Sequence, residues 1–422
     1  MSNSSMFRFM LIIVICFCVS FNVCEALTVF PDDPVESNSA RSLAMGSACI
    51  AVSDGKSSYL SNPATLVLIE RSMITGGINL DQIAEEEYSY GELGLDNSQV
   101  YINPLRYQHL AITAKSFSAS LGRSMLIDYF RKTENINEDS SSTFSSKGGL
   151  YSISASAAKS VTPEFSVGGS LNILDGKADI ENTYSWETID YNDSNWWDED
   201  YTPQTKRNSE TTTVEQTESG YNFSVGALYN LNEQVNIGAV YNTSAEVTLK
   251  TKKTTTEDGN TDILDTEKFK WTYPTSMGFG LSYKSGQFLV VGEIHRVNWS
   301  EYKHGKVGES LTRPEYVNLT TYHVGIEYMT SADASDPIFL RCGFNTSPFH
   351  FLREVSSDET SGYFLTAGIG MNLNDIKIDI GGRIGKKTYS DFSSEDEYEA
   401  SIKSVIGNLS YKFDMSSFAK QN

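Results

Sequence analysis

The sequence has few basic side chains and no long apolar run outside its N-terminus. Of its 422 residues, 33 are Lys or Arg and 54 are Asp or Glu, which gives a formal net charge of −21. Nucleic-acid binding requires basic patches, so this balance argues against a nucleic-acid partner. A transmembrane helix needs roughly 20 apolar residues, and a mean hydropathy of −0.31 excludes a protein built from many such helices. A membrane β-barrel stays possible, because only every second residue of its strands is apolar.

Enzyme motifs are also missing. The five His residues are scattered, without the H-x-x-x-H spacing that would suit a metal site. Neither the G-x-S-x-G turn of a hydrolase nor a phosphate-binding loop occurs. We therefore expect no enzymatic activity, no metal and no cofactor.

The N-terminus has the features of an export signal. Residues Met10 to Val23 are apolar, and Cys24-Glu25-Ala26 forms a small-x-small cleavage site. The apolar stretch is too short for a stable anchor, so we interpret residues 1–26 as a cleaved signal peptide, with an uncleaved anchor as the alternative. The exported chain would keep Cys49 and Cys342, and no pattern in the sequence indicates that they pair.

A period of two residues dominates the chain from about residue 72 onward. Within 151–157, Tyr, Ile and Ala alternate with Ser, and the same period recurs in segments 165–173, 235–241, 277–283, 322–328, 363–371 and 405–413. Such alternation places one face of a strand against an apolar medium and the other against small polar groups. Strings of Ser, Gly, Asn and Thr on the polar face are typical of a barrel lumen.

The connections between these segments alternate in length. Short turns alternate with long polar stretches, as in outer-membrane barrels with periplasmic turns and external loops. The long stretches are 81–106, 131–147, 175–219, 245–267, 298–317, 346–360 and 388–398. We count fourteen strands, near 72–80, 107–115, 118–130, 148–159, 164–174, 220–230, 234–244, 268–283, 287–297, 318–328, 338–346, 361–372, 375–387 and 399–413.

The sequence therefore predicts an all-β fold, a transmembrane antiparallel β-barrel over residues 72–413. In lipid every backbone N–H and C=O needs a partner, so the strands must close on themselves. Fourteen strands enclose a lumen that their own side chains do not fill. Residues 27–71 precede the first strand and could enter the lumen as a hatch, and residues 414–422 form a C-terminal tail.

One long connection carries a cluster of Trp residues. Trp186, Trp196 and Trp197 lie near the acidic run Asp198-Glu199-Asp200. They are candidates for an external landing site for an amphipathic ligand. The alternative is aromatic side chains at the bilayer interface beside a solvated acidic loop.

The segment after the predicted signal peptide resembles a known family. Residues 40–54 read ARSLAMGSACIAVSD, and Ser61-Asn62-Pro63-Ala64 follows. This is similar to the "AR-x-x-x-MGGA-x-x-A" and "NPA" signature of the FadL family of outer-membrane transport proteins. Further similar segments, which extend the resemblance over nearly the whole mature chain, are 225–230 with 236–242, 273–280, 298–300 and 340–348.

The chain departs from the family pattern at three places. Ser47 stands where the family has the second Gly of "MGGA", and Lys56 replaces a position that is usually small or acidic. Nine residues, Asp414 to Asn422, follow the last aromatic residue of the final strand, Phe413. A terminal aromatic residue is normally the assembly signal in such barrels.

The resemblance implies a transporter of hydrophobic small molecules, typically long-chain fatty acids, in the outer membrane of a diderm bacterium. It implies capture at external loops, a shift of the hatch and release through a gap in the wall. The hatch would include Met45, Gly46, Asn62, Pro63 and Ala64. Pro63 restricts Asn62 to extended backbone, which suits a hinge, and an ordinary turn is the alternative. Outer-membrane lipid and the outer-membrane assembly machinery are the other implied partners.

A carboxylate ligand in an apolar pocket would need a cation. By the alternation, Arg341 and His323 face the lumen, because their neighbours in the strand are apolar. Arg offers a fixed fork of donors for a carboxylate. The alternative is that both side chains only pair with acidic groups of the lumen.

Two other functions fit the same pattern. One is a secretion-associated barrel of the same superfamily that captures exported proteins, and the other is an interaction or adhesion barrel that uses the acidic loops. A transporter should have an apolar site and a gap in its wall, whereas a secretion partner should bind protein without lipid specificity.

Overall fold

The computed structural model describes most of the chain from residue 39 onward. The described residues are 39–53, 61–89, 92–93, 97–114, 116–129, 131–136, 140–190, 204–257, 260–309, 316–330, 336–348, 361–390 and 397–414. The predicted signal peptide, Lys56, Trp196, Trp197 and residues 415–422 lie outside them.

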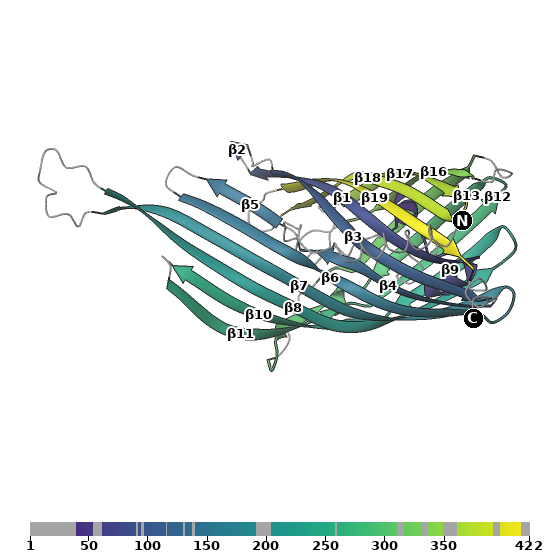
Figure 1. Cartoon of the computed structure of the whole chain (residues 1–422), viewed down its shortest axis with the longest axis horizontal. Coiled ribbons are helices and arrows are strands. Elements are labelled where there is room, and N and C mark those ends of the chain that lie inside the picture. The colour runs from purple at the N-terminus through teal and green to yellow at the C-terminus, as the bar shows by residue number, and fades with distance from the viewer. Residues whose placement is uncertain are drawn as a thin grey trace, which may run out of the picture.

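The described chain is a single antiparallel sheet rolled into a barrel (Figure 1). Its strands in chain order are β1 (Ser72–Ser89), β2 (Glu92–Leu93), β3 (Asn97–Ala114), β4 (Phe117–Asp128), β5 (Arg131–Ile136), β6 (Ser140–Ser160), β7 (Phe165–Asp190), β8 (Gln204–Asn230), β9 (Val235–Asn242), β10 (Ala245–Glu257), β11 (Asn260–Tyr273), β12 (Ser276–Ser285), β13 (Phe288–Val297), β14 (Lys303–Lys306), β15 (Leu319–Met329), β16 (Ile338–Thr346), β17 (Ser361–Leu373), β18 (Ile376–Ser390) and β19 (Glu397–Phe413).

The first and last strands close the barrel. β1 pairs with β19 in antiparallel register from Ser72 opposite Phe413 to Tyr88 opposite Glu397. The barrel has 14 strands, which confirms the predicted fold class. The additional short strands continue its walls: β10 extends β9 beyond Thr243-Ser244, and β11 leads into β12 across Pro274-Thr275.

Several stretches predicted as loops are strands instead. The segment 175–219 forms the outer halves of β7 and β8, and 245–267 forms β10 and much of β11. Outside lipid both faces of a sheet contact water, so the apolar alternation ends although the ladder of hydrogen bonds continues. Threonines such as Thr211 to Thr213 support such strands because their branched side chains favour extended backbone. The β7–β8 hairpin accordingly projects far beyond the rest of the wall (Figure 1).

The wall has an apolar outer face and a polar inner face. Outward side chains such as Ile78, Leu121 and Phe279 are more than half exposed, at 55%, 56% and 60%. Ser124, Ser154 and other small polar residues are buried on the inner face. A continuous belt of large exposed apolar side chains is unfavourable in water and suits contact with lipid.

The described residues form three short helices besides the strands. They are α2 (Ala40–Ala44), η1 (Pro63–Leu68) and η2 (Trp299–Glu301). None of the described helices has the length and apolar character needed to cross a membrane.

Candidate functional site

The residues that precede β1, described over 39–53 and 61–71 and called the N-terminal segment below, lie against the inner face of the barrel. α2 contacts β16 to β19, whereas η1 contacts β3, β4, β6, β7 and β8. Between them, Ile50 lies against Gly238 of β9 and Gly280 of β12. A single segment that contacts strands around nearly the whole circumference must lie inside the lumen. The contacted positions are near the short turns, since Gly238 is only three residues into β9.

Glycines of the wall allow this close approach. A Cβ atom at Gly226 would collide with Oδ1 of Asn62, and one at Gly343 would collide with the backbone of Met45 and Gly46. The backbone of the segment therefore packs directly on the backbone of the strands. Substitution of either wall glycine would displace the segment.

Asn62 and Pro63 begin the second helix of the segment. The Asn62 side chain accepts a hydrogen bond from the Ala64 backbone N–H (3.1 Å), and Pro63 occupies the first turn, where its missing N–H costs nothing. Asn62 Nδ2 also donates to the carbonyls of Ile50 (2.8 Å) and Ala227 (3.1 Å). Asn62 thus links both halves of the segment to β8.

Met45 and Gly46 lie at the turn that ends α2. Gly46 has φ +66° and Ser47 has φ +64°, so two successive residues adopt left-handed backbone. This conformation favours glycine and costs an ordinary residue about 1–2 kcal/mol. Ser47, the departure from the family motif, therefore occupies a position whose backbone is suited to glycine.

His323 contacts this turn. Its Nδ1 donates to the carbonyl of Gly46 (2.7 Å), and its ring packs edge-on against His295 with centroids 4.9 Å apart. His295 in turn contacts Glu293 (3.1 Å), whose other oxygen accepts the backbone N–H of Ile50. Two neighbouring strands therefore hold the segment by its backbone.

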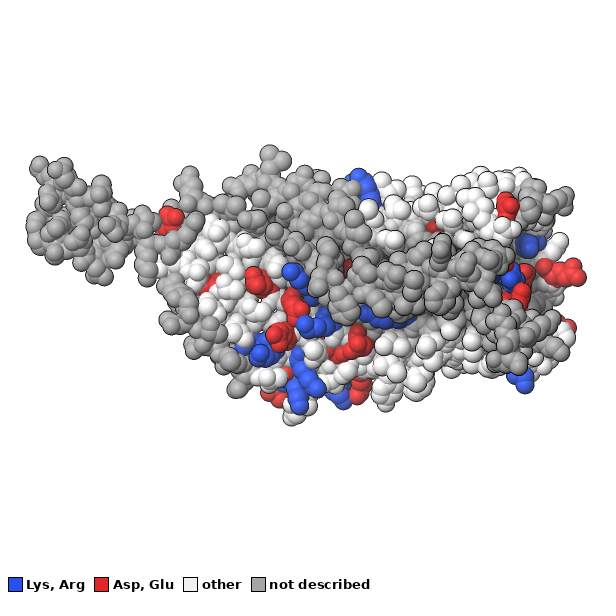
Figure 2. All heavy atoms as spheres, in the orientation of Figure 1, with Lys and Arg blue, Asp and Glu red and all other residues white. Residues whose placement is uncertain are grey.

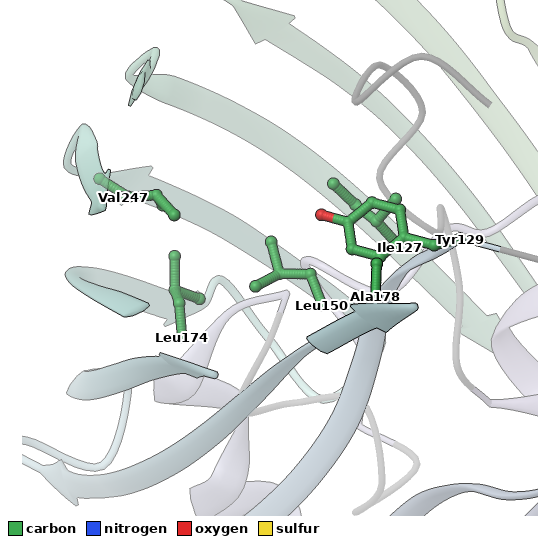
Figure 3. Close-up of a cluster of buried hydrophobic side chains, with 7 residues drawn as sticks. Ile127, Tyr129, Leu150, Leu174, Ala178 and Val247 are labelled. Carbon is green, nitrogen blue, oxygen red and sulfur yellow. The ribbon is translucent and has the colours of Figure 1, made fainter. Parts of the chain in front are cut away.

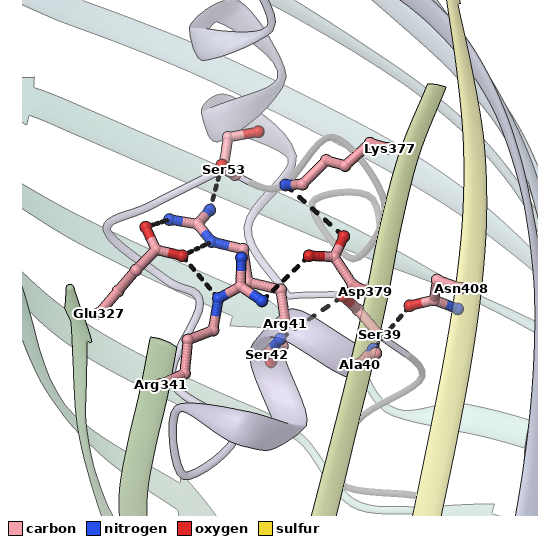
Figure 4. A network of polar contacts seen from close by, with 10 residues as sticks. All are labelled: Ser39, Ala40, Arg41, Ser42, Ser53, Glu327, Arg341, Lys377, Asp379 and Asn408. Atoms are coloured by element: carbon pink, nitrogen blue, oxygen red, sulfur yellow. Dashed lines mark hydrogen bonds and ion pairs between the residues drawn. The ribbon is translucent and has the colours of Figure 1, made fainter. Parts of the chain in front are cut away.

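A buried network of charges holds α2 to the wall (Figure 4). Arg41 binds Glu327 with both ends of its guanidinium, and its Nη1 donates to the carbonyl of Ser53 (2.8 Å). Arg341 binds the same carboxylate through Nε (2.6 Å) and lies 3.0 Å from Asp379. Lys377 lies 3.6 Å from the second oxygen of Asp379.

Arg341 of this network was predicted from the sequence to face the lumen, whereas its partners were not. Glu327 and Asp379 alternate with apolar residues just as His323 does, so the period of two could have placed them on the inner face. No local pattern could have paired Glu327 with Arg41, which lies 286 residues away in the chain.

A cluster of apolar side chains lies farther from the short turns, on the inner face of β4, β6, β7 and β10 (Figure 3). It consists of Ile127, Tyr129, Leu150, Leu174, Ala178, Ala245 and Val247, all buried. Leu150 is ten residues from the end of β6 at Ser160. At about 3.3 Å per residue, the cluster lies on the loop side of the N-terminal segment.

One carboxylate lies beside this cluster. Glu218, only 2% exposed, accepts hydrogen bonds from the Tyr129 hydroxyl (2.6 Å) and from Gln216 Nε2 (2.6 Å). A Cβ atom at Gly176 would touch both Glu218 and Leu150, which shows that the carboxylate and the apolar side chains adjoin. Neither Tyr129 nor Glu218 was singled out from the sequence, because no motif marks them.

The wall next to the cluster contains a seam. β3 and β4 pair only from Tyr107 opposite Ser124 down to the short turn. Farther out, the described residues of β3 pair with β1, and those of β4 and β5 pair with β6. The β1–β3 register shifts beside Ile78, opposite the stretch that contains Pro104, and the β4–β6 register shifts at Leu126. Pro104 has no N–H for a ladder, which suits such an interruption.

The remaining candidates lie apart from this region. Trp186 stands near the outer end of β7, stacked on Tyr184 with centroids 5.3 Å apart. Cys49 is buried in the segment and Cys342 is exposed on β16, and neither forms a disulfide with a described residue.

The family of the chain follows from comparison with known proteins. A family model described as outer membrane protein transport protein (OMPP1/FadL/TodX) matches residues 34–419. The chain belongs to this family.

Solved structures agree with this FadL/TodX-family assignment at the level of the fold. The Pseudomonas putida toluene transporter TodX aligns with a TM-score of 0.63 at 16% identity, covering 90% of this chain and 99% of that chain. A Pseudomonas aeruginosa FadL homologue aligns with a TM-score of 0.60 at 13% identity, covering 91% and 99%. The Ralstonia pickettii toluene transporter TbuX aligns with a TM-score of 0.59 at 17% identity, covering 90% and 99%. No curated protein sequence matches at a significant level.

Membership of the FadL/TodX family and the barrel fold place the chain in the outer membrane, in a family of transport proteins. The end of the barrel that carries the short turns then faces the periplasm, and the end that carries the long β7–β8 hairpin faces the exterior.

Proposed function

We propose that the protein takes up hydrophobic small molecules through the outer membrane, by way of the apolar cluster around Leu150 and Val247. The observation that supports this most strongly is the position of the cluster, on the loop side of the N-terminal segment and beside the seam between β3 and β4. An apolar ligand that enters from outside would find there both an apolar surface and an interruption of the wall.

The inner wall below the cluster favours lateral release over passage along the lumen. Ser120, Ser124, Ser154 and Ser156 make this part of β4 and β6 polar. A hydrocarbon gains nothing by moving from apolar side chains to hydroxyl groups. The seam between β3 and β4 offers a path into the bilayer that avoids this polar wall.

The N-terminal segment would act as the hatch of this route. Asn62 holds it to β8, whereas Gly46 and Arg41 hold it to His323 and Glu327 of β15. Because these contacts are polar and directional, a small displacement would break several of them together. We propose that occupation of the apolar cluster shifts the segment around Asn62-Pro63-Ala64.

Glu218 supports one ligand class over another. The sequence resemblance pointed to long-chain fatty acids, whereas the similar solved structures include proteins described as a toluene transporter and a monoaromatic hydrocarbon channel. A buried carboxyl group beside the cluster repels an anionic head group when it is ionised. The site therefore supports a neutral apolar ligand best, with fatty acids as the second class.

Equilibrium binding to the purified full-length barrel in detergent tests the proposal. Labelled toluene and palmitate are compared with butyrate as the short-chain control. We expect saturable binding of toluene, weaker binding of palmitate and none of butyrate, and Leu150→Asn should weaken binding about ten-fold or more. Ile153→Asn, on the outer face of the same strand, is the matched control. A well-folded barrel that binds neither toluene nor palmitate would contradict the proposal and favour capture of exported proteins.

A further inference from the structure

Five lysines gather on the outer face of neighbouring strands β10, β11 and β14. Directly opposed residues of antiparallel strands share one face of the sheet. Lys250 stands opposite Lys268, Lys270 opposite Thr248, and Lys303 opposite Thr272. Lys252 follows on the same face of β10. Val247 and Leu249, which alternate with these positions, are buried on the inner face.

Only two of the five lysines are neutralised by neighbours. Lys270 Nζ lies 2.7 Å from Glu246, and Lys252 Nζ lies 3.9 Å from Glu215. Lys250, Lys268 and Lys303 have no ion pair with the described residues. Five lysines and two glutamates leave three positive charges on this face, in a chain of net charge −21.

The pair Lys250 and Lys268 is unfavourable by itself. Like charges directly opposite each other destabilise a sheet. An anion that contacts both ammonium groups would relieve this repulsion. The arrangement therefore fits a bound anion better than a bare surface.

The lysines lie at the level of lipid head groups. On β8 the last outward aromatic side chain is Tyr221, 62% exposed and paired with Glu246. Lys250 pairs with Thr217, four residues farther from the turn or about 13 Å along the strand. Outward aromatic residues mark the membrane interface, so the lysines are just outside it. Figure 2 shows charged side chains gathered over this part of the molecule, whereas the apolar belt is largely free of them.

We propose that Lys250, Lys268 and Lys303 bind the phosphate groups of a phosphorylated glycolipid in the outer leaflet. Ammonium groups bind phosphate as point charges, and basic clusters beside a membrane recognise phosphorylated head groups. Three free ammonium groups on three adjacent strands match a sugar head group that carries two phosphates. The acyl chains would lie on the apolar belt below, near Tyr221 and Phe223.

Binding of bisphosphorylated lipid A to the full-length protein in detergent tests this site, with native mass spectrometry as the readout. The variant Lys250→Gln/Lys268→Gln/Lys303→Gln is compared with Lys177→Gln. Lys177 is the matched control, because it lies on the same face and at the same height but is paired with Asp179 (3.0 Å). Heat-modifiable migration on gels verifies that each variant is folded.

The lysine triple variant should lose about five-fold in affinity per lysine, while Lys177→Gln binds as the parent protein does. Lipid A stripped of both phosphates should bind the parent protein as weakly as the intact lipid binds the triple variant. In the parent protein, affinity for intact lipid A should also fall as salt rises. Equal binding by the triple variant, equal binding of the stripped lipid, or phosphatidylglycerol binding as tightly as lipid A would each overturn the proposal.

Discussion

Arg41 of the N-terminal segment and Glu327 of β15 form a bidentate ion pair inside the barrel. Both contacts measure 2.8 Å, and the side chains are only 11% and 9% exposed. A guanidinium and a carboxylate that form two parallel hydrogen bonds fix the relative orientation of the two side chains and also pair their charges. The pair joins the N-terminal segment to a strand of the wall, so its loss should weaken the attachment of the segment.

We expect Arg41→Gln to loosen the segment without unfolding the barrel. Removing one partner of a buried ion pair lowers the free energy of unfolding by about 3–5 kcal/mol. The loss should be smaller here, because Arg341 still binds Glu327. Single-channel conductance in a planar bilayer should rise, since the segment occupies the lumen. Arg71→Gln is the control, because Arg71 forms its pairs with Asp375 and Asp414 at an exposed site, where such pairs contribute about 0–1 kcal/mol. Unchanged conductance in both variants would contradict the prediction.

Ser47→Gly should stabilise the protein. It relieves left-handed backbone at φ +64°, worth about 1 kcal/mol after the greater flexibility of glycine is counted. Gly46→Ala should destabilise it instead, because the added Cβ would press on the backbone of Phe344 and Val324. Thermal unfolding in detergent measures both variants side by side. A lower melting temperature for Ser47→Gly would show that its backbone is not strained.

A reversible lock tests whether the segment moves during transport. Ala48 and Val291 belong to one buried cluster between the segment and β13, so Ala48→Cys with Val291→Cys can join them by a disulfide. The native thiols Cys49 and Cys342 are replaced by Ser to prevent other pairings. The oxidised barrel should lose ligand uptake by cells and regain it on reduction. Full uptake in the oxidised state would show that uptake does not require this segment to move away from β13.

Glu218→Gln should change the preference among ligands. Removing the carboxyl takes away the repulsion that its ionised form exerts on a carboxylate ligand, so palmitate affinity should rise several-fold while toluene affinity stays the same. The Gln side chain keeps an acceptor for the Tyr129 hydroxyl. Binding titrations of both ligands to the same preparation measure the ratio. An unchanged ratio would place the ligand away from Glu218.

Arg341→Gln should affect stability rather than ligand binding. The guanidinium is fully buried, with Nε on Glu327 and Nη1 beside Asp379. Its Nη2 makes no hydrogen bond to the described residues but is buried as well, so no end of the group is exposed to a ligand carboxylate. Its loss removes an ion pair from both Glu327 and Asp379 and should cost about 3 kcal/mol or more. Chemical unfolding and palmitate titration together check this prediction. A large loss of palmitate affinity in a stable variant would make Arg341 a ligand residue after all.

The sequence by itself determined where strands cross the membrane. Lipid on one side and polar groups on the other impose a period of two, which predicted all fourteen barrel strands and the inward direction of Arg341 and His323. The same period fails beyond the bilayer, where β7 and β8 continue with water on both faces. Strand length outside lipid therefore depended on pairing between neighbours, which no single strand reveals.

Only the tertiary structure decided which inward groups meet. Barrel closure brings Arg41 to Glu327 across 286 positions of the chain. It also assembles the apolar cluster from one or two residues of each of four wall segments. The seam between β3 and β4 likewise arises from two register shifts, one in each strand's other ladder. Such contacts depend on the stagger of neighbouring strands, which is a property of the closed barrel and not of any segment within it.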